Sequence, residues 1–276
     1  MTYKILALGG GGSKGILHVG VIKAIEEFGL NFEEIYGCSI GSIYATAIAF
    51  GLNSEALERM SAKFSSFNEA FIGKLTLLGL SDSLTKKGLF KMDMLEDFVV
   101  NLILDETGIN LREKKISDAP IPLRICASNI TKKCLTVFEG DFPIMKAIRA
   151  SCCIPVLFCP QTINGCLYID GGFLTNIILD YIQPEKRKQT FSVSIIHNNP
   201  NLTPENTFKL SYVEFLYGLY KVACLYERKI NLYKNNIDLK YNITGISDVG
   251  PKERNEMILH GYESARRFLS ENCGQE

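Results

Sequence analysis

A serine between two glycines is the first feature of this sequence that could carry out nucleophilic chemistry. Gly37-Cys38-Ser39-Ile40-Gly41 follows a short apolar run and precedes a run of small and apolar residues typical of a buried helix. This pattern at a strand–helix junction is typical of a nucleophile elbow, whose sharp turn exposes the serine hydroxyl group. We therefore expect Ser39 to be a nucleophile, with Gly37 and Gly41 relieving crowding around it. The alternative is that these small residues only allow close helix packing.

A glycine loop precedes this turn, at Gly10-Gly11-Gly12-Ser13-Lys14-Gly15, between a strand pattern and a helix pattern. Glycines let the backbone approach a ligand, and unpaired N–H groups at a helix start attract negative charge. Such a loop suits a phosphate group or the oxyanion of an acyl transfer. A dinucleotide site would need an acidic residue at the tip of the next strand. Here Glu33 and Glu34 precede that strand, which disfavours a nucleotide-dependent oxidoreductase.

A carboxylate on a glycine turn could supply the base that a serine nucleophile needs. Asp170-Gly171-Gly172 follows an apolar strand pattern at Cys166–Ile169. In isolation, Asp170 would be read as part of an ordinary Asp-Gly turn. Together with the other two motifs, it becomes the candidate general base for Ser39.

These three motifs, in this order, resemble the signatures of the patatin-like phospholipase family. The segment Ala147–Ser151, followed by Pro155 and Phe158, is similar to the part of the family that precedes its catalytic Asp. The resemblance spans roughly Tyr3 to Asp180 and leaves the last third of the chain uncovered.

The resemblance implies a Ser39–Asp170 dyad that hydrolyses the fatty-acyl esters of phospholipids or other lipids through an acyl-enzyme. It also implies an oxyanion hole formed by the amides of Gly10, Gly11 and Gly12. Other motif residues support these groups: Lys14, Gly15, Gly37, Gly41, Gly171 and Gly172. For Arg149 and Ser151 we favour helix-end packing over a role in orienting a phosphate or the active-site loop. We expect no cofactor.

Strand and helix patterns alternate along the chain, which predicts an α/β fold with a mainly parallel sheet flanked by helices on both faces. The resemblance implies the patatin-like three-layer form of it. We expect residues 1–188 to form the catalytic domain and residues 189–276 to complete or cover that same domain. Further elements are predicted as follows: strands at Tyr3–Leu8, Ile35–Tyr36, Leu123–Ala127, Leu135–Phe138, Phe191–Ile196 and Leu239–Ile243; helices at Lys14–Phe28, Ser39–Phe50, Ser54–Lys63, Pro143–Ser151, Phe208–Asn235 and Pro251–Leu269.

The composition excludes several classes of function. Thirty Lys and Arg balance thirty Asp and Glu, so no global positive field favours nucleic acid or anionic lipid. The nine cysteines are scattered, without zinc-type spacing or a C-x-x-C motif, which favours reduced thiols and no metal site. Because no signal peptide is readable, we expect a cytoplasmic protein, able to contact membranes peripherally through apolar surface.

Two alternatives remain open for the function. An α/β-hydrolase triad could combine Ser39 and Asp170 with His197 or His260, because the chain order permits it. A catalytically silent module that binds lipid or a protein partner is the other alternative. His18 is expected to lie in the core or behind the site.

Two apolar segments are candidates for a lid or an acyl-chain groove. Phe64–Leu80 and Phe208–Tyr233 both have more apolar side chains than one helix face can bury. For the second segment, packing within the core is the favoured interpretation. Whether a protein activator exists is not readable from the sequence.

Overall fold

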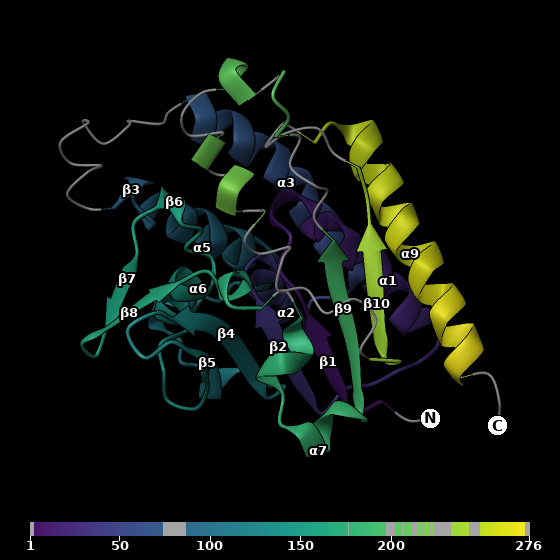
Figure 1. Ribbon diagram of the computed structural model, residues 1–276. Helices are drawn as coiled ribbons and strands as arrows, with labels where there is room; N and C mark the ends of the chain where they lie inside the picture. The colour runs from purple at the N-terminus through teal and green to yellow at the C-terminus, as the bar shows by residue number, and fades with distance from the viewer. Residues whose placement is uncertain are drawn as a thin grey trace.

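An eight-stranded sheet forms the centre of the protein (Figure 1). The computed structural model describes residues 3–73, 87–175, 177–196, 202–205, 207–210, 215–216, 218–220, 222, 233–242 and 249–273. The strands along the main path of the sheet lie in the order β10-β9-β1-β2-β4-β8-β7, and β5 pairs with β4. Their bounds are Ile5–Leu8 for β1, Glu34–Cys38 for β2, Leu123–Asn129 for β4, Cys134–Phe138 for β5, Gln161–Ile163 for β7, Cys166–Ile169 for β8, Thr190–Ile196 for β9 and Asn236–Lys240 for β10.

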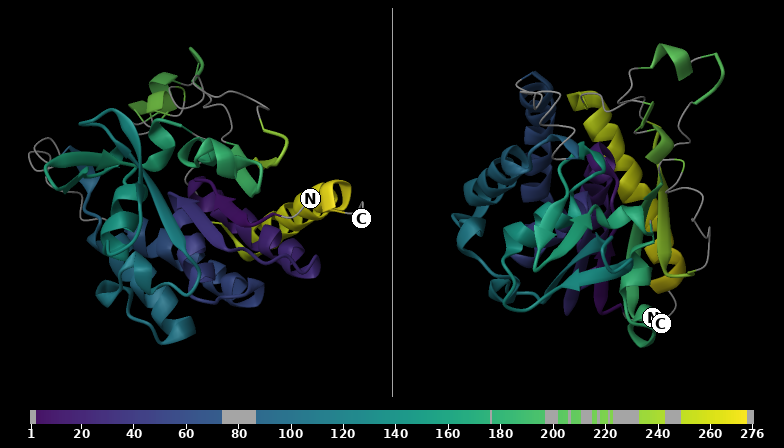
Figure 2. Two further views of the ribbon diagram at one scale, coloured as in Figure 1. Left: turned by 90° about the horizontal axis from the view of Figure 1, so that it is seen from below. Right: turned by 60° about the vertical axis from the view of Figure 1, so that its left-hand side comes forward.

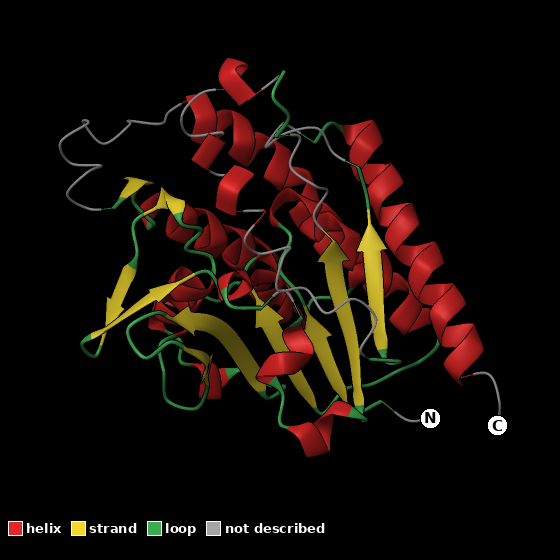
Figure 3. Cartoon of the chain, viewed as in Figure 1, coloured by secondary structure: helices red, strands yellow, loops and turns green. Residues whose placement is uncertain are grey.

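Most of the sheet is parallel. Strands β10, β9, β1, β2 and β4 run in one direction, and β5, β7 and β8 add antiparallel pairs at one side (Figure 3). The predicted α/β fold with a mainly parallel sheet is therefore confirmed. Three short strands were not predicted: β7, and β3 and β6 (Gly88–Phe90 and Val156–Phe158), which pair in a separate small sheet. Three-residue strands give too short an alternation to be recognised.

The long helices pack on one face of this sheet. They are α1 (Leu17–Glu27), α2 (Ile40–Ala49), α3 (Ser54–Gly73), α5 (Asp93–Thr107), α6 (Ile144–Ser151) and α9 (Pro251–Cys273). Alternate residues of β1 separate the two faces, because Leu6 and Leu8 belong to the core on the helix side. Ile5 and Ala7 instead pack with the segment containing the 3-10 helix η5 (Ile178–Tyr181). The sheet thus lies between two covering layers. A short helix, α7 (Pro184–Arg187), leads into β9.

The C-terminal part of the chain joins the same sheet and helix layer. Strand β9 pairs with β1, and β10 pairs with β9. Helix α9 lies along α1, as the yellow and purple helices of Figure 2 show. A Cβ atom on Gly261 would overlap the carbonyl oxygen of Leu17, and one on Gly20 would overlap that of Ile258. The two helices therefore contact each other backbone to backbone.

Strand β10 begins earlier than predicted. The sequence predicted Leu239–Ile243, but the strand covers Asn236–Lys240. Its polar side chains have a structural role, since Asn236 Oδ1 accepts hydrogen bonds from Ser192 at 2.5 Å and Ser194 at 3.0 Å on β9. The start of β10 was therefore missed in the sequence because its polar residues, which form hydrogen bonds to β9, interrupt the apolar pattern of a buried strand.

The two candidate lid segments lie largely outside the described residues. The backbone of α3 continues to Gly73, beyond the predicted end at Lys63, and residues 74–86 are not described. Of the predicted helix Phe208–Asn235, the described parts are the 3-10 helix η6 (Thr207–Lys209) and helical residues at 215–216, 218–220 and 222. Among the described residues, no helix is long and apolar enough to span a membrane.

Candidate active site

The register of the sheet brings Ser39 and Asp170 together although they are far apart in sequence. In the parallel pair β2–β4, Cys38 is opposite Cys126, and in the antiparallel pair β4–β8, Ser128 is opposite Ile169. Ser39 follows Cys38 and Asp170 follows Ile169, so both residues lie at the same level of β4. Strand β2 reaches this level parallel to β4 and strand β8 reaches it from the opposite direction, so the turns after the two strands lie on either side of β4.

Ser39 occupies a sharp turn between β2 and α2. Its backbone angles are φ 52° and ψ −130°, a region that residues other than glycine rarely adopt. The turn is also crowded, since a Cβ atom on Gly37 would lie 2.5 Å from Ser42 Cα, and one on Gly41 would overlap the carbonyl oxygen of Leu8. A side chain at either flanking glycine would therefore clash with the backbone beside this turn.

The side chains of Ser39 and Asp170 form a direct hydrogen bond. Ser39 Oγ donates to Asp170 Oδ2 at 2.6 Å, and Asp170 Oδ1 accepts from the Gly172 amide at 2.8 Å. Burial raises the pKa of Asp170 to about 6, while these two hydrogen bonds act in the opposite direction. Asp170 is 3% exposed. At neutral pH the carboxylate is therefore ionised but basic enough to accept a proton from a hydroxyl group.

The glycine loop lies against Ser39. Since Leu8 is opposite Gly37 in the β1–β2 pair, Gly10 is at the level of Ser39. A Cβ atom on Gly10 would lie 2.9 Å from Ser39 Cβ, so a side chain there would displace the serine. The amides of Gly11 and Gly12 donate no hydrogen bond within the described part of the chain, and the Gly10 amide interacts with the Cys38 thiol.

The other motif residues surround this centre. Lys14 is buried in the 3-10 helix η1 (Gly12–Ile16) and donates from Nζ to the Ile196 carbonyl at 3.2 Å. Gly15 packs against Ile40, next to the nucleophile. Gly171 lies against Cys38, and its carbonyl accepts a hydrogen bond from Tyr181 at 2.7 Å. The structure thus brings together the residues of all three motifs.

Ser151 contacts the backbone of Ser39. The Ser39 amide donates to Ser151 Oγ at 2.8 Å, and Ser151 Oγ donates to the Cys126 carbonyl at 2.6 Å. This contact agrees with the alternative interpretation of Ser151, orientation of the active-site loop, which we did not favour from the sequence. Ser151 ends α6 and fixes the strained Ser39 turn to β4. Its place in the segment before Asp170 was the available signal, but serine at a helix end is too common to specify this contact.

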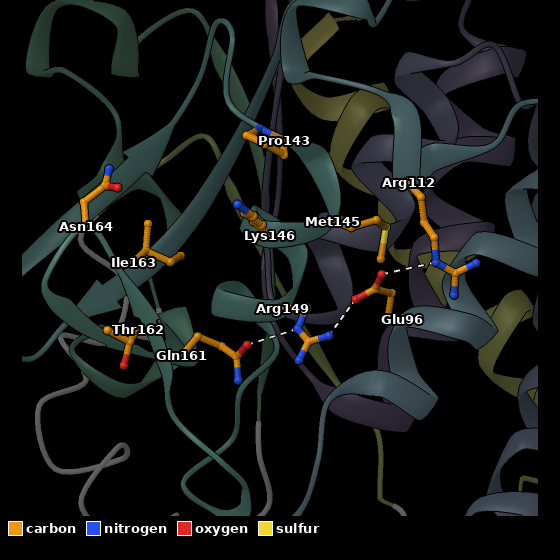
Figure 4. A pocket seen from close by; sticks show the side chains of 10 residues that line it. All are labelled: Glu96, Arg112, Pro143, Met145, Lys146, Arg149, Gln161, Thr162, Ile163 and Asn164. Atoms are coloured by element: carbon orange, nitrogen blue, oxygen red, sulfur yellow. Dashed lines mark hydrogen bonds and ion pairs between the residues drawn. The ribbon is translucent and has the colours of Figure 1, made fainter.

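Arg149, by contrast, pairs with acidic residues at a polar cavity (Figure 4). Its guanidinium donates to Asp93 at 2.9 Å, to Glu96 at 2.6 Å and to Gln161 Oε1 at 3.0 Å. These contacts join α5, α6 and β7. The favoured packing interpretation of Arg149 agrees with this network.

Buried cysteines surround Asp170 but do not form a metal site. Burial, together with the Asp170 charge, raises the pKa values of Cys38, Cys152 and Cys153, so these thiols remain protonated at neutral pH. Because thiolates are the nucleophilic form, these thiols do not compete with Ser39. In the described part of the chain, no cluster of three or more His, Cys, Asp or Glu could hold a metal ion.

Of the two candidate triad histidines, the structure describes His260. His260 lies on α9, where its ring is 5.9 Å from that of Tyr241. His197 lies outside the described residues. His18 is fully buried below the glycine loop, and its Nε2 lies 2.9 Å from the Gly9 carbonyl oxygen.

Comparisons with known proteins cover this region of the chain. A family model described as patatin-like phospholipase matches residues 6–182, which contain all three motifs. The Bacillus subtilis protein YqhO is 28% identical over 73% of this chain and 75% of its own length. The lysophospholipase NTE1 of Meyerozyma guilliermondii is 28% identical over 69% of this chain, but this chain spans 12% of that protein.

Two solved structures share the fold. VipD from Legionella pneumophila matches with a TM-score of 0.57 and 18% identity, over 98% of this chain and 67% of VipD. A chain of the ExoU–SpcU complex from Pseudomonas aeruginosa matches with a TM-score of 0.56 and 16% identity, over 99% of this chain and 52% of that chain. With the family model covering more than half of its residues, the chain belongs to the patatin-like phospholipase family.

Proposed function

We propose that this protein is a lipid acyl hydrolase that uses a Ser39–Asp170 dyad. Membership of the family supports lipid acyl hydrolysis in general. The single observation that supports the dyad is the 2.6 Å hydrogen bond from Ser39 Oγ to the buried carboxylate of Asp170. A hydroxyl group needs a partner that removes its proton, and Asp170 is the hydrogen-bond acceptor beside it.

The proposed reaction has two steps. Ser39 Oγ attacks the ester carbonyl carbon as its proton passes to Asp170, and the oxyanion that forms faces the amides of the glycine loop. The alcohol then leaves with the proton from Asp170, and the acyl group stays on Ser39. Water subsequently attacks this acyl-enzyme, with Asp170 again accepting and returning the proton, and the fatty acid is released.

This mechanism predicts how activity depends on pH. The base must be ionised, and burial raises the pKa of Asp170 to about 6. We expect kcat/KM to rise as the pH increases through about 6 and then to level off.

We propose a phospholipase A-type substrate, reached through the side of the sheet toward which the parallel strands point. The described pieces of residues 207–222 lie on that side (Figure 1). Tyr220 stacks on Phe173, which follows the Asp170 turn, with 6.0 Å between the ring centroids. Phe208, Leu219 and Val222 are exposed apolar side chains in the same segment. Exposed apolar side chains beside a site suit contact with acyl chains at a lipid surface.

The test is mass spectrometry of lipid products from phospholipid vesicles, using the wild type, Ser39→Ala and Asp170→Asn side by side. We expect fatty acid and lysophospholipid from the wild type, and loss of both products with either variant. Labelling by a fluorophosphonate should also depend on Ser39. Retained turnover in Ser39→Ala would refute the assignment.

Two control variants test the alternatives. His197→Ala and His260→Ala should retain hydrolysis, since the proposed base is Asp170. If either folded variant is inactive, a triad replaces the dyad. If the wild type neither hydrolyses lipid nor is labelled, the silent binding module is the correct interpretation.

A further inference from the structure

His18 is a buried titratable residue that the proposed reaction does not use. It lies at the start of α1 and is 0% exposed. Its Nε2 lies 2.9 Å from the carbonyl oxygen of Gly9, and its Nδ1 has no hydrogen-bond partner among the described residues. Leaving a buried polar atom unpaired costs about 1–3 kcal/mol. An apolar side chain would avoid that cost, so stability alone does not account for a histidine here.

The state of the His18 ring follows from its surroundings. A carbonyl oxygen can only accept a hydrogen bond, so the contact with Gly9 requires a proton on Nε2. Burial lowers the pKa of His18 to about 4, although the hydrogen bond to Gly9 opposes this shift. At neutral pH the ring is therefore neutral, with its single proton directed at the Gly9 carbonyl.

This hydrogen bond fixes the orientation of the Gly9–Gly10 peptide. In a planar trans peptide, the C=O of Gly9 and the N–H of Gly10 point in opposite directions. Because the Gly9 carbonyl points at His18, the Gly10 amide points away from His18. The Gly10 amide, on the other side of this peptide, interacts instead with the Cys38 thiol.

The hydrogen bond of the Gly9 amide does not fix the orientation of the Gly9–Gly10 peptide. The Gly9 amide donates to the Val193 carbonyl at 2.8 Å, which attaches the loop to β9. That bond holds the peptide on the N-terminal side of Gly9. A glycine backbone can otherwise rotate freely between the two peptides.

We propose that His18 is a positioning residue that holds the Gly9–Gly10 peptide, and with it the glycine loop whose amides face Ser39. The proposal rests on the proposed function, because the amides of this loop matter there as donors to the oxyanion. Without the donor of His18, the peptide can flip, and the oxyanion loses an aligned amide. Loss of one such donor costs up to 10²–10³-fold in kcat in a serine protease.

The test compares two variants of similar size. His18→Leu fills the space but cannot donate, whereas the side-chain amide of His18→Gln can donate to the Gly9 carbonyl. We expect His18→Leu to lower kcat about 10–100-fold with little change in KM, because the loss affects the transition state only. His18→Gln should recover kcat to within a few-fold of the wild type. The rate constant of fluorophosphonate labelling should follow the same order.

Two controls separate positioning from folding. Tyr44→Phe alters the ring that packs 5.8 Å from His18 without touching Gly9, and should keep wild-type kcat. Thermal melting should show His18→Leu to be at least as stable as His18→Gln. If His18→Leu does not fold, His18→Met replaces it as the variant without a donor.

The results that would overturn the proposal are distinct from failure of the proposed function. Equal kcat values for the Leu and Gln variants, whether both high or both low, would show that donation to Gly9 does not matter. Turnover that persists in Ser39→Ala would instead refute the dyad. With Ser39→Ala inactive and His18→Leu fully active, only the role of His18 would be wrong.

Discussion

Glycine allows close backbone contact in two regions of this molecule, with opposite energetic consequences. At the candidate active site, Gly10 brings a loop against Ser39, whose positive φ is unfavourable, beside the buried carboxyl group of Asp170. At the contact between α1 and α9, Gly20 and Gly261 let two helices pack backbone to backbone. The first region holds groups in costly states that chemistry requires. The second supplies packing that stabilises the fold, so substitutions should separate activity from stability.

The largest expected effect on stability is at the helix contact. In Gly261→Val the new side chain would overlap the Leu17 carbonyl, and backbone on both sides leaves no room for it to move. We expect a loss of at least about 3 kcal/mol, or no cooperative unfolding at all. Thermal melting followed by circular dichroism measures this. Gly250→Ala is the control, since a Cβ atom there meets nothing within 4 Å. If both variants had the same melting temperature, the close helix contact would not be a source of stability.

Asp170→Asn should abolish activity and stabilise the protein. Activity should fall by about 10⁴-fold, as when the buried Asp of a serine protease triad is changed to Asn. Burial raises the pKa of Asp170 from 3.8 to about 6, so the folded state binds more protons than the unfolded state between these values. Stability of the wild type therefore falls as the pH rises through this window, by about 3 kcal/mol in total.

Urea unfolding from pH 4 to pH 8 tests this sign. Asn stays neutral, so Asp170→Asn should gain stability over the wild type as the pH rises, with the difference complete above about pH 6. The His18 contribution has the opposite sign, because burial lowers its pKa to about 4, but it is present in both proteins and cancels. A variant that is less stable than the wild type at pH 8 would contradict the cost that we assign to the buried carboxylate.

Gly10→Ala should reduce activity with a small effect on stability. The new methyl group would lie 2.9 Å from Ser39 Cβ and would move the nucleophile by a few tenths of an ångström. Misplacement by about 1 Å can cost 10²-fold, so we expect kcat to fall about 10-fold or more. Melting should stay within about 1 kcal/mol of the wild type in free energy. Destabilisation as large as that of Gly261→Val would remove the distinction between the two regions.

Ser151→Ala should have the smallest effect on activity, and it should also lower stability. It removes the acceptor of the Ser39 amide and leaves that buried N–H and the Cys126 carbonyl each without this partner, at about 1–3 kcal/mol. We expect a several-fold loss of kcat from a looser Ser39 turn. Ser192→Ala is matched, because Ser192 is also buried and donates to a side chain on a neighbouring strand. Ser192→Ala should lower stability and leave kcat unchanged. If it lowers kcat as much as Ser151→Ala does, the effect of Ser151 on activity is indirect.

The parts of the site made by neighbouring residues were predictable from the sequence. The glycines around Ser39 and the turn after Asp170 are local patterns, because each turn must satisfy its own backbone sterics. The same holds for the strands β1, β2, β4, β8 and β9, whose apolar runs were recognised. Both the α/β fold and its mainly parallel sheet followed from their alternation with helices.

Contacts between distant residues were not predictable in the same way. Ser151 reaches Ser39 because α6 ends beside β4, and no periodicity in one segment encodes where another segment ends. The pairing of β10 with β9 depends on Asn236 hydrogen bonds that make the strand look polar. Likewise, the requirement for glycine at positions 20 and 261 is apparent only when α9 is packed against α1.

The register that unites the dyad has a consequence for protein synthesis. Ser39 and Asp170 are separated by 131 residues and meet through strand β4, which pairs with β2 on one side and with β8 on the other. A growing chain carries its nucleophile long before it carries its base, and forming such distant contacts is slow. A fragment that ends before Asp170 therefore lacks the proposed dyad. If the proposed hydrolysis is correct, the cell's lipids meet a competent enzyme only when the whole sheet has formed.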